Sequence, residues 1–395
     1  MSSMREFVKS IGKFVILGLI YPYQYRKYSS LPLERKKVVF VEVRGEEGFV
    51  GASMRQVFDR VAADGSWNIR CHFLREGVGS RKENLRRTME MLKDVATAGY
   101  VFLSEANNAF SRFEKRPETK VIQLWHGCGA FKKFGFSTAG LRFGSSRRQQ
   151  EKYPLYHNLD LVTVSSPEVI WAYREAMGVD EGIIRATGVS RTDVFFDDEY
   201  VKAAARKVRE TMPAIGERKI LLYAPTFRGD VSRAQAPRMP DMEYMRSRLA
   251  DRYVVLMKQH PFVKNRPAVP EGCGNFLFDV TDSLAIDELI CAADMCISDY
   301  SSLVFEYALF ERPMIFFAYD IDSYDDWRGF YYDYDELTPG PVVKTTEELV
   351  RDIEKFEKIF DAAEVRAFAG RFMSACDGKA TDRILEWAGM EKREN

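Results

Sequence analysis

Residues 294–310 read DMCISDYSSLVFEYALF, and this stretch decides the fold expected for the chain. The apolar residues before the turn predict a short buried strand, and the apolar spacing after it predicts a helix. The turn between them suits an anion such as a phosphate, because helix N–H groups without partners and the positive end of the helix dipole meet there. An ordinary helix cap fits the same pattern, because Ser and Asp cap helices in many proteins. The polar residues of the turn are Ser298, Asp299, Ser301 and Ser302.

Three further polar turns follow apolar, strand-like runs in the same way. They are Trp125-His126-Gly127, Tyr223–Gly229 and Lys258-Gln259-His260-Pro261. In open α/β sheets, ligands bind outside the carboxyl ends of the strands. We therefore expect the four turns to line one cleft.

Strand-like runs alternate with helical patterns along almost the whole chain, and many of the runs are continuously apolar. Such runs are typical of parallel strands buried on both faces, and the alternation favours right-handed βαβ units. The predicted fold class is therefore α/β, with two Rossmann-like, doubly wound domains that face a cleft. The predicted strands are Lys37–Val43, Ile69–Leu74, Tyr100–Ser104, Val121–Leu124, Leu161–Ser165, Lys219–Tyr223, Tyr253–Lys258, Phe276–Phe278, Met295–Ser298 and Met314–Phe317.

The predicted domains are 31–212 and 213–395, because the turn that begins at Met212 follows a charged helical stretch and divides the chain into two halves of domain size. An amphipathic N-terminal segment, 1–30, precedes them. Its apolar run Phe14–Tyr21 has basic flanks and is too short for a bilayer span, which takes about 20 residues. Two interpretations stay open for this segment: a helix lying in the membrane interface, or a first helix docked on the domain.

The composition is that of an ordinary globular protein, with 395 residues, 46% of them hydrophobic, and a formal net charge of zero. The six cysteines show no CxxC spacing, and no Cys/His pair has the spacing of zinc ligands. We therefore expect reduced thiols and no metal site. The basic stretch Arg142–Arg148 is not accompanied by a nucleic-acid-binding motif, so we expect no nucleic-acid partner. The oligomeric state cannot be predicted from these patterns.

Side chains in these turns have the chemistry of a phosphate-transfer site. His126 could deprotonate a hydroxyl beside a phosphate, close to two lysines in the same loop. Thr226 can donate to a phosphate oxygen, and Arg228 offers two parallel N–H groups to such oxygens. Lys258 and His260 add two potential cations. Each of these residues also has a structural interpretation, as a side chain that ties its own turn together or as a surface cation.

Other nucleotide-binding and catalytic motifs are missing from the sequence. There is no GxxxxGK[ST] loop and no GxSxG elbow, and Gly77-Val78-Gly79 lacks the third glycine of a dinucleotide motif. Asp320-Ile321-Asp322 forms a DxD pair, which in some glycosyltransferases holds a divalent metal and a nucleotide diphosphate. Its acidic, tyrosine-rich surroundings instead favour a solvated loop.

Several stretches resemble the CDP-glycerol glycerophosphotransferases of teichoic acid and related polymer synthesis, in order from about Val38 to Val343. The form Gly127-Cys128-Gly129 resembles the shorter, primase-like members. The matching stretches are Gln123–Gly135, Thr187–Asp193, Tyr223–Arg228, Lys258–Pro261, Ile297–Tyr307 and Arg312–Phe317.

The resemblance implies a GT-B arrangement in which 213–395 holds the donor nucleotide and 31–212 the acceptor. It implies transfer of a polyol phosphate, glycerol phosphate first and ribitol phosphate as the alternative, to a hydroxyl of a membrane lipid-linked saccharide. The donor would be CDP-glycerol or CDP-ribitol, CMP would be released, and no metal or other cofactor would be needed. The enzyme would work peripherally at the cytoplasmic face of the cell membrane, held through the N-terminal segment.

The resemblance also assigns roles to residues of the four turns. His126 and His260 would be catalytic, with His126 as the general base. Acceptor or phosphate contacts would come from Gly127, Lys132 and Lys133. Donor-binding contacts would come from Thr226, Arg228, Lys258, Ser298, Asp299, Ser301, Ser302 and Glu306.

Two other functions stay open at this point. A GT-B glycosyltransferase would move a sugar from a nucleotide sugar and release a nucleoside diphosphate instead of CMP. A binding module of the same fold would need no candidate base such as His126.

Overall fold

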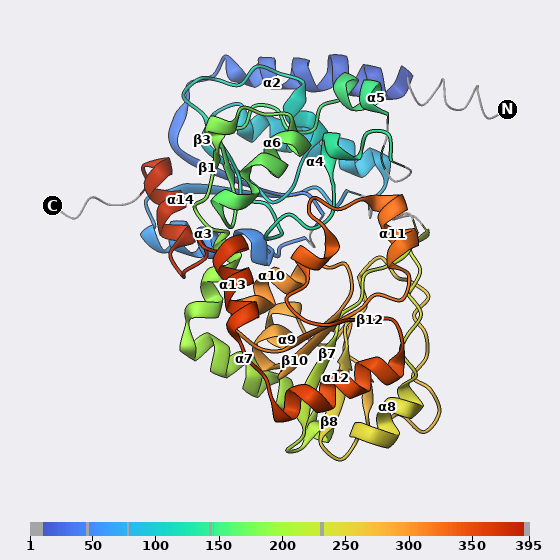
Figure 1. Cartoon of the computed structure of the whole chain (residues 1–395). Coiled ribbons are helices and arrows are strands. Elements are labelled where there is room, and N and C mark those ends of the chain that lie inside the picture. The colour runs from blue at the N-terminus through green and yellow to red at the C-terminus, as the bar shows by residue number, and fades with distance from the viewer. Residues whose placement is uncertain are drawn as a thin grey trace.

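The protein contains two parallel six-stranded sheets, one above the other in the view of Figure 1. The computed structural model describes residues 11–44, 47–76, 79–141, 144, 146–229 and 233–390. Parts of three predicted features lie outside these residues: positions 1–10 of the N-terminal segment, Gly77 and Val78 of the incomplete glycine motif, and Arg142, Phe143 and Ser145 of the basic stretch.

The first sheet has the strand order β2-β1-β3-β4-β5-β6, and every neighbouring pair is parallel. Its central strands are continuously apolar because helices cover both faces, and Val38 to Val41 are all buried. Helices α3 (Ala52–Asp64), α4 (Arg81–Val95) and α6 (Ile170–Met177) connect its strands. The strands are β1 (Glu34–Glu42), β2 (Asn68–Phe73), β3 (Ala98–Leu103), β4 (Lys120–Gln123), β5 (Leu161–Thr163) and β6 (Ile184–Arg185).

The second sheet has the order β12-β11-β10-β7-β8-β9 and is also parallel throughout. Its strands are β7 (Lys219–Tyr223), β8 (Tyr253–Met257), β9 (Leu277–Asp279), β10 (Met295–Ser298), β11 (Met314–Phe317) and β12 (Val342–Val343). Its helices are α8 (Met242–Leu249), α9 (Ile286–Ala292), α10 (Leu303–Ala308), α11 (Ile321–Arg328) and α12 (Thr346–Lys358).

The predicted α/β class with two doubly wound sheets is confirmed. Three predicted strands, those now labelled β7, β10 and β11, have the predicted bounds, and the other seven shift by one to three residues at their ends. The two strands that sequence reasoning missed, β6 and β12, have two residues each and lie at sheet edges. Two residues are too few for a periodic pattern to show.

The two halves exchange helices. Helix α7 (Asp198–Thr211) precedes the predicted boundary at 212 but packs on α9 of the second half. Helices α13 (Ala363–Phe372) and α14 (Ala380–Ala388) follow the second sheet, and α14 returns to lie against α3 in Figure 1. Lys120 Nζ donates to the carbonyl of Ala388 at 2.9 Å, where the helix end carries partial negative charge. The boundary itself stays a prediction.

The N-terminal segment is a docked helix with an apolar outer face. Helical residues 11–15 run into η1 (Ile16–Ile20) and α2 (Tyr21–Ser29), and α2 packs on α4. Leu17, Tyr21 and Tyr25 are buried against the domain, whereas the exposed fractions of Phe14, Leu19 and Tyr23 are 56%, 57% and 68%. Within the described residues, no helix combines the length and the apolar character that crossing a bilayer requires.

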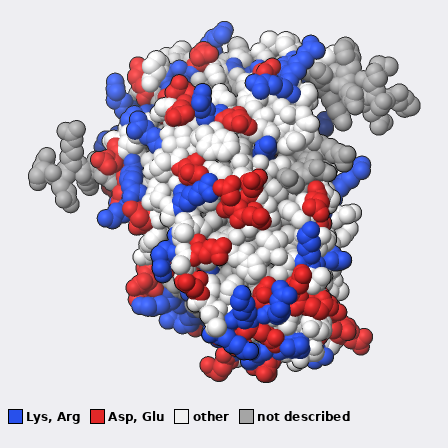
Figure 2. All heavy atoms as spheres, viewed as in Figure 1, with Lys and Arg blue, Asp and Glu red and all other residues white. Residues whose placement is uncertain are grey.

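Acidic and basic side chains are interspersed over the face shown in Figure 2, without a continuous area of one sign. This mixture agrees with the formal net charge of zero.

Asp193 fixes the return of α14, and its loss should destabilise the protein. Its carboxylate accepts from the N–H groups of Ala380 at 3.0 Å and Thr381 at 2.8 Å, in place of a cap from α14's own Lys379. We expect Asp193→Ala to lower the free energy of unfolding by about 1–2 kcal/mol, the usual value of a helix cap. Thermal unfolding monitored by circular dichroism measures this.

Asp251→Ala is the matched control, because the Asp251 side chain is 78% exposed. Equal midpoints of unfolding for the two variants would contradict the capping role of Asp193.

Candidate active site

The turns after β4 and β10 meet between the two sheets. A Cβ atom added to Gly127 would lie 3.6 Å from the Ser302 hydroxyl oxygen, so the two predicted turns are in contact range. Further along the first loop, the Lys133 N–H donates to the carbonyl of Gly329 at 3.0 Å. The loop of the first half is therefore held against the second half.

His126 follows a strained residue. Trp125 has a φ of 62°, a left-handed conformation that costs a bulky side chain about 1–2 kcal/mol. The Trp125 ring lies 4.5 Å from the His126 ring, centroid to centroid. The His126 residue is exposed to solvent, but desolvation by the surrounding protein and the charges of Arg191 and Arg44 lower the pKa of its ring to about 4. The imidazole is therefore neutral at pH 7 and able to accept a proton.

Gly129 lets this loop approach α10. Its φ is +61°, and an added Cβ would lie 2.3 Å from the ring of Phe305. Its N–H donates to the Ser165 hydroxyl at 2.9 Å. A glycine is required here both for the left-handed backbone and for the close packing.

Arg191 connects His126 to the second half. It belongs to the first half, where it follows β6, and one of its terminal nitrogens donates to the His126 carbonyl at 3.1 Å. The other donates to Asp287 of α9 at 2.5 Å, and its Nε forms an ion pair with Glu306 of α10 at 2.9 Å. The alignment of that last contact is too poor for a hydrogen bond, so we treat it as charge pairing. The three side chains are 7–13% exposed.

Glu306, predicted to contact the donor, pairs with Arg191. Burial raises the pKa of Glu306 to about 7, although the charge of Arg191 opposes the shift. The Cys128 sulfur lies 4.0 Å from a Glu306 oxygen. Glu306 therefore lies behind the His126 loop.

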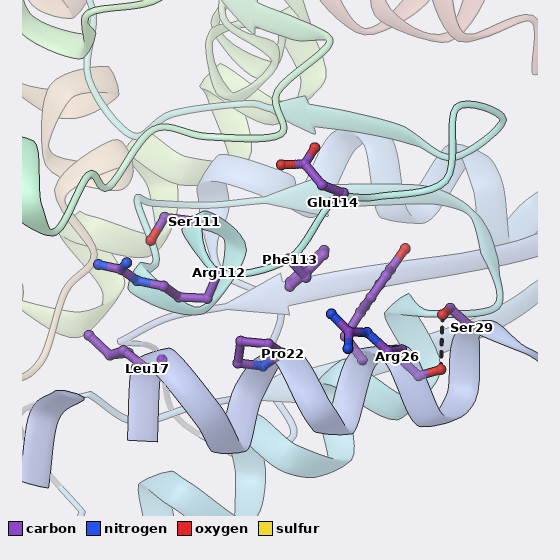
Figure 3. Close-up of a pocket in the computed structure, with 10 residues that line it drawn as sticks. Leu17, Pro22, Arg26, Ser29, Ser111, Arg112, Phe113 and Glu114 are labelled. Carbon is purple, nitrogen blue, oxygen red and sulfur yellow. Dashed lines mark hydrogen bonds between the residues drawn. The ribbon is translucent and has the colours of Figure 1, made fainter. Parts of the chain in front are cut away.

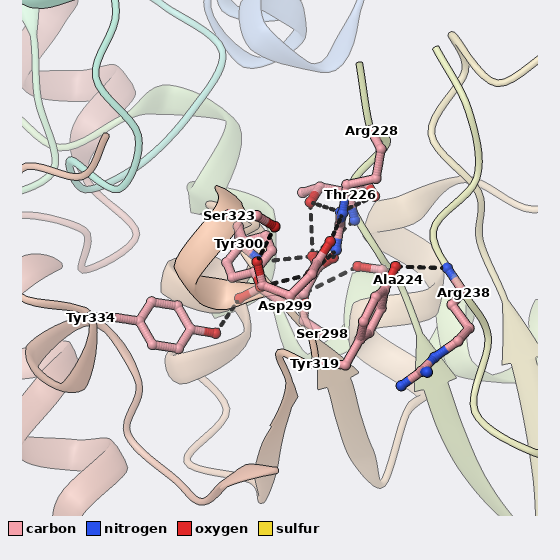
Figure 4. Close-up of polar contacts among 11 residues, drawn as sticks. Ala224, Thr226, Arg228, Arg238, Ser298, Asp299, Tyr300, Tyr319, Ser323 and Tyr334 are labelled. Atoms are coloured by element: carbon pink, nitrogen blue, oxygen red, sulfur yellow. Dashed lines mark hydrogen bonds and ion pairs between the residues drawn. The ribbon is translucent and has the colours of Figure 1, made fainter. Parts of the chain in front are cut away.

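Asp299 joins the turns after β7 and β10 (Figure 4). One carboxylate oxygen accepts from the Thr226 N–H at 2.8 Å, the Thr226 hydroxyl at 3.0 Å and the Tyr300 N–H at 2.6 Å. The other lies 3.0 Å from a terminal nitrogen of Arg228. Asp299 is 2% exposed, so this network is internal.

Protein acceptors surround the guanidinium of Arg228. Nε and one terminal nitrogen bind the two oxygens of Asp320 at 2.6 and 3.0 Å, and the second of these also faces Asp299. The remaining nitrogen donates to the Thr226 carbonyl and hydroxyl at 2.7 and 3.1 Å. The guanidinium also lies over the rings of Tyr300 and Tyr324. The charges of Asp299 and Asp320 raise the pKa of Arg228, although burial opposes the shift.

The interpretation of Asp320 as part of a solvated loop is wrong. Its side chain is 19% exposed, and besides Arg228 it accepts from the Tyr300 hydroxyl at 2.9 Å. The other carboxylate of the DxD pair, Asp322, is 95% exposed and lies 3.7 Å from Lys344. Among the described residues, no group of three or more His, Cys, Asp or Glu side chains could hold a metal ion.

Ser298 and Lys258 also bind protein groups. The Ser298 hydroxyl donates to the Ala224 carbonyl at 3.0 Å. Lys258 Nζ donates to the carbonyls of Thr281, at 2.7 Å, and Leu284. Burial lowers the pKa of Lys258.

One ring nitrogen of His260 forms a hydrogen bond within its own turn. Its Nδ1 accepts from the N–H of Phe262 at 3.2 Å, so the neutral ring carries its proton on Nε2. The ring packs against Phe227 and Phe262. Burial, together with the charge of Lys132 from the first half, lowers the pKa of His260 to about 4. His260 is thus a neutral N–H donor at pH 7.

The remaining predicted residues lie in the same region. The Ser301 hydroxyl accepts from the Leu303 N–H at 3.3 Å. Ser302 precedes α10, and its side chain makes no cap bond to that helix. Lys132 and Lys133 are half-buried.

The structure therefore forms two groups from the predicted residues. His126, Gly127 and Ser302 lie together, and Thr226, Arg228 and Asp299 lie together. Lys258 is turned toward residues 281–284 instead.

Sequence reasoning missed Arg191, Asp287 and Asp320 as parts of this site. The only available signal for Arg191 was its place in the Thr187–Asp193 stretch. No spacing rule connects it to His126 or α10, because the contacts arise only in the folded chain.

Comparisons with known proteins identify the family of the chain. Residues 23–388 match the family described as CDP-Glycerol:Poly(glycerophosphate) glycerophosphotransferase. The teichoic acid ribitol-phosphate primase of Bacillus spizizenii is 33% identical over 90% of this chain and 92% of its own length. The teichoic acid poly(ribitol-phosphate) polymerase of the same organism is 33% identical over 93% of this chain, which spans only 58% of that longer protein.

Solved structures of the wall teichoic acid polymerase TagF share the fold. One has a TM-score of 0.77 at 22% identity and covers 98% of this chain and 97% of that chain. Another was obtained after a soak with CDPG. The similarity confirms the predicted GT-B-like fold, and the family match confirms the predicted class of enzyme, a phosphotransferase. The chain belongs to the CDP-glycerol:poly(glycerophosphate) glycerophosphotransferase family.

Proposed function

We propose that the protein transfers a polyol phosphate from a CDP-activated donor to a hydroxyl of a lipid-linked acceptor and releases CMP. The observation that supports the proposal is that Gly127, which follows the neutral His126, lies within contact range of Ser302 of the other half, so a candidate base and candidate phosphate donors come from neighbouring turns. This is the arrangement that hydroxyl attack on a phosphate requires.

In the proposed reaction, the acceptor oxygen attacks the phosphorus that bears the polyol. His126 takes the hydroxyl proton as the new phosphorus–oxygen bond forms. The anhydride bond to the cytidylyl phosphate breaks, and its bridging oxygen leaves with CMP together with the bonding electrons. The products are a phosphodiester, CMP and a proton that passes from His126 to solvent.

We assign the direct contacts with the donor phosphates to the Nε2–H group of His260, the hydroxyls of Ser301 and Ser302, and the charges of Lys132 and Lys133. Preorganised donors of this kind stabilise charge that develops on phosphate oxygens. In this proposal Arg228, which is hydrogen-bonded to Asp320 and Thr226 and paired with Asp299, is a positioning residue that fixes the turns carrying these donors.

The other residues that were predicted to bind the donor are positioning residues in this proposal, like Arg228. The geometry of the turns is held by Thr226, Asp299, Ser298 and Lys258. Glu306 and Asp287 hold Arg191 behind the His126 loop.

Glycerol phosphate remains the first candidate for the transferred group, because the family is described by it. Ribitol phosphate is the second candidate, because two relatives at 33% identity carry ribitol phosphate in their names.

The N-terminal helix is proposed to attach the protein to the membrane surface on its cytoplasmic side. It has exposed Phe14, Leu19 and Tyr23 on one face, with Arg26 and Lys27 nearby. An interfacial helix of this kind buries its apolar face among lipids and pairs its cations with anionic headgroups.

CMP release tests the proposed reaction. We expect acceptor-dependent CMP from CDP-glycerol or CDP-ribitol when a lipid-linked disaccharide is supplied with EDTA present. His126→Ala should lower this rate by about a hundred- to ten-thousandfold, the usual contribution of a general base, and leave donor binding measured by calorimetry unchanged.

His157→Ala is the matched control, because the His157 side chain is 46% exposed and lies outside the site. If neither CDP donor gave CMP, and nucleotide sugars gave a nucleoside diphosphate, the glycosyltransferase alternative would be established.

The pH profile tests the electrostatic role of Arg191. The acid limb of kcat/KM should have its midpoint below 6.5, the pKa of an unperturbed histidine, because the pKa of His126 is lowered. Arg191→Gln removes a positive charge that disfavours the imidazolium, so the pKa of His126 should rise and the limb should move to higher pH.

Arg191→Lys keeps the positive charge and should leave the midpoint of the acid limb unchanged. The rate should still fall, because lysine cannot reproduce the forked hydrogen-bond geometry of arginine. The same midpoint in the Gln and Lys variants would show that Arg191 does not tune His126.

Vesicle binding tests the membrane proposal. The variant Phe14→Asn, Leu19→Asn, Tyr23→Asn should bind anionic vesicles at least about tenfold more weakly in co-sedimentation, because burial of each side chain in lipid is lost. The control carries Trp171→Asn, Phe196→Asn and Ile359→Asn, three exposed apolar residues elsewhere. Equal pelleting of the two variants would reject the N-terminal helix as the anchor.

A further inference from the structure

Two pockets beside the N-terminal helix meet at one arginine–tyrosine pair. One, of about 500 Å³, lies between α2 and residues 111–114, and Figure 3 shows Leu17, Pro22 and Arg112 around it. The other, of about 310 Å³, lies between Lys13 and the segment from Gly135 to Tyr156. Arg112 lines the first and Tyr153 lines the second. The Arg112 guanidinium lies 5.1 Å from the centre of the Tyr153 ring.

Positive charge gathers around Tyr153. Lys13 Nζ lies 4.0 Å from the ring centre and Lys152 Nζ lies 5.4 Å from it, in addition to Arg112. The hydroxyl of Tyr153 and the Nε of Arg112 are both buried, and neither has a hydrogen-bond partner among the described residues. A buried donor without a partner is costly, so a ligand that supplies acceptor oxygens is favoured here.

One carboxylate opposes this charge. Glu114 lines the outer part of the larger pocket, but its side chain is 94% exposed and is screened by water. Three cations within 5.4 Å of the centre of one ring, together with two unused donors, therefore suit an anion with several oxygens, such as a phosphate ester.

The smaller pocket has the chemistry of a saccharide site. Its walls carry the amides of Asn108, Gln149 and Gln150 and the rings of Phe136 and Tyr156, and none of the described residues that line it is acidic. Amides can pair with sugar hydroxyls, and apolar ring faces can cover the C–H face of a sugar.

This pocket also lies close to the proposed base. The ring of Tyr156 lies 6.1 Å from that of Trp125, which is 4.5 Å from the ring of His126. Two successive ring contacts, Tyr156 to Trp125 and Trp125 to His126, therefore connect the pocket to the proposed base.

We propose that these pockets bind the phosphate-linked part of a lipid-linked saccharide acceptor. The phosphate sits at Lys13, Arg112 and Tyr153, and the adjoining sugar occupies the pocket of Gln149 and Tyr156. The first carbons of the lipid lie against the apolar side chains of the larger pocket, Leu17 and Pro22, beside Tyr25 and Phe113, whose ring centroids are 3.9 Å apart. This inference rests on the proposed function, since it names the acceptor contacts of the same reaction.

Two soluble acceptors test the inference without membranes: a disaccharide joined to a short alkyl chain through a diphosphate, and the same disaccharide as its alkyl glycoside. In Tyr153→Phe, which loses only a hydroxyl, the KM for the diphosphate acceptor should rise about tenfold, the usual effect of losing a hydrogen bond to a charged group. The KM for the glycoside and for the CDP-polyol should stay unchanged.

Two further variants separate the parts of the site. Lys13→Gln should reproduce the selective effect, with Lys202→Gln on α7 as its control, because the Lys202 side chain is 69% exposed and distant in the fold. Gln149→Ala should raise the KM for both acceptors, because it contacts the sugar in either one.

Unchanged KM values for the diphosphate acceptor in Tyr153→Phe and Lys13→Gln, in an enzyme that releases CMP, would overturn the inference. Calorimetric binding of the two acceptors tests it without turnover. The wild-type protein could release no CMP and still bind the diphosphate acceptor more tightly than the glycoside, with this preference lost in Tyr153→Phe. That outcome would support the proposed binding pocket and reject the proposed function. Equal binding of both acceptors to the wild type would reject the pocket.

Discussion

The charge pairing of Arg191 with Asp287 and Glu306 is the interaction on which the site depends. It holds a first-half guanidinium between two helices of the second half and fixes the backbone of His126 through its carbonyl. A buried ion group of this kind contributes little net stability when intact, but removing one member leaves unpaired charge that costs about 3–5 kcal/mol. The raised pKa of Glu306 shows that the pairing offsets only part of the desolvation cost. The same three side chains therefore connect the two halves to each other and to the proposed base.

A second network does the same for the donor side. Asp299 accepts hydrogen bonds from the backbone N–H and the hydroxyl of Thr226. Arg228 donates to Asp320 and Thr226 and forms an ion pair with Asp299. The ends of β7 and β10 are thereby fixed before any ligand arrives. Preorganisation of this kind lowers the cost of binding, since the turn does not have to be ordered by the donor.

The fold could be predicted from the sequence because its signals are local. Buried parallel strands such as β10 are short apolar runs that end in polar turns, and both parts are visible in one stretch. The turns of the site, including His126 and His260, could be predicted because each follows an apolar run directly in the sequence. Arg191 and Asp320 could not be found, because a charged residue in a loop has the same appearance whether it faces water or a buried partner. Only the tertiary contacts distinguish the two cases, and the pairs Arg191–Asp287 and Arg228–Asp320 are more than 90 positions apart.

The lowered pKa of His126 limits how the proposed reaction can proceed. An imidazole with a pKa near 4 is a weak base and cannot hold the proton of a free hydroxyl. It can accept that proton only late, when bonding to phosphorus has made the hydroxyl far more acidic. The rate would then depend mainly on how well the hydroxyl and phosphorus are aligned and how well the charge on the phosphate oxygens is stabilised, as expected for phosphoryl transfer. Networks that fix the turns, instead of a strong base, are what such a mechanism needs.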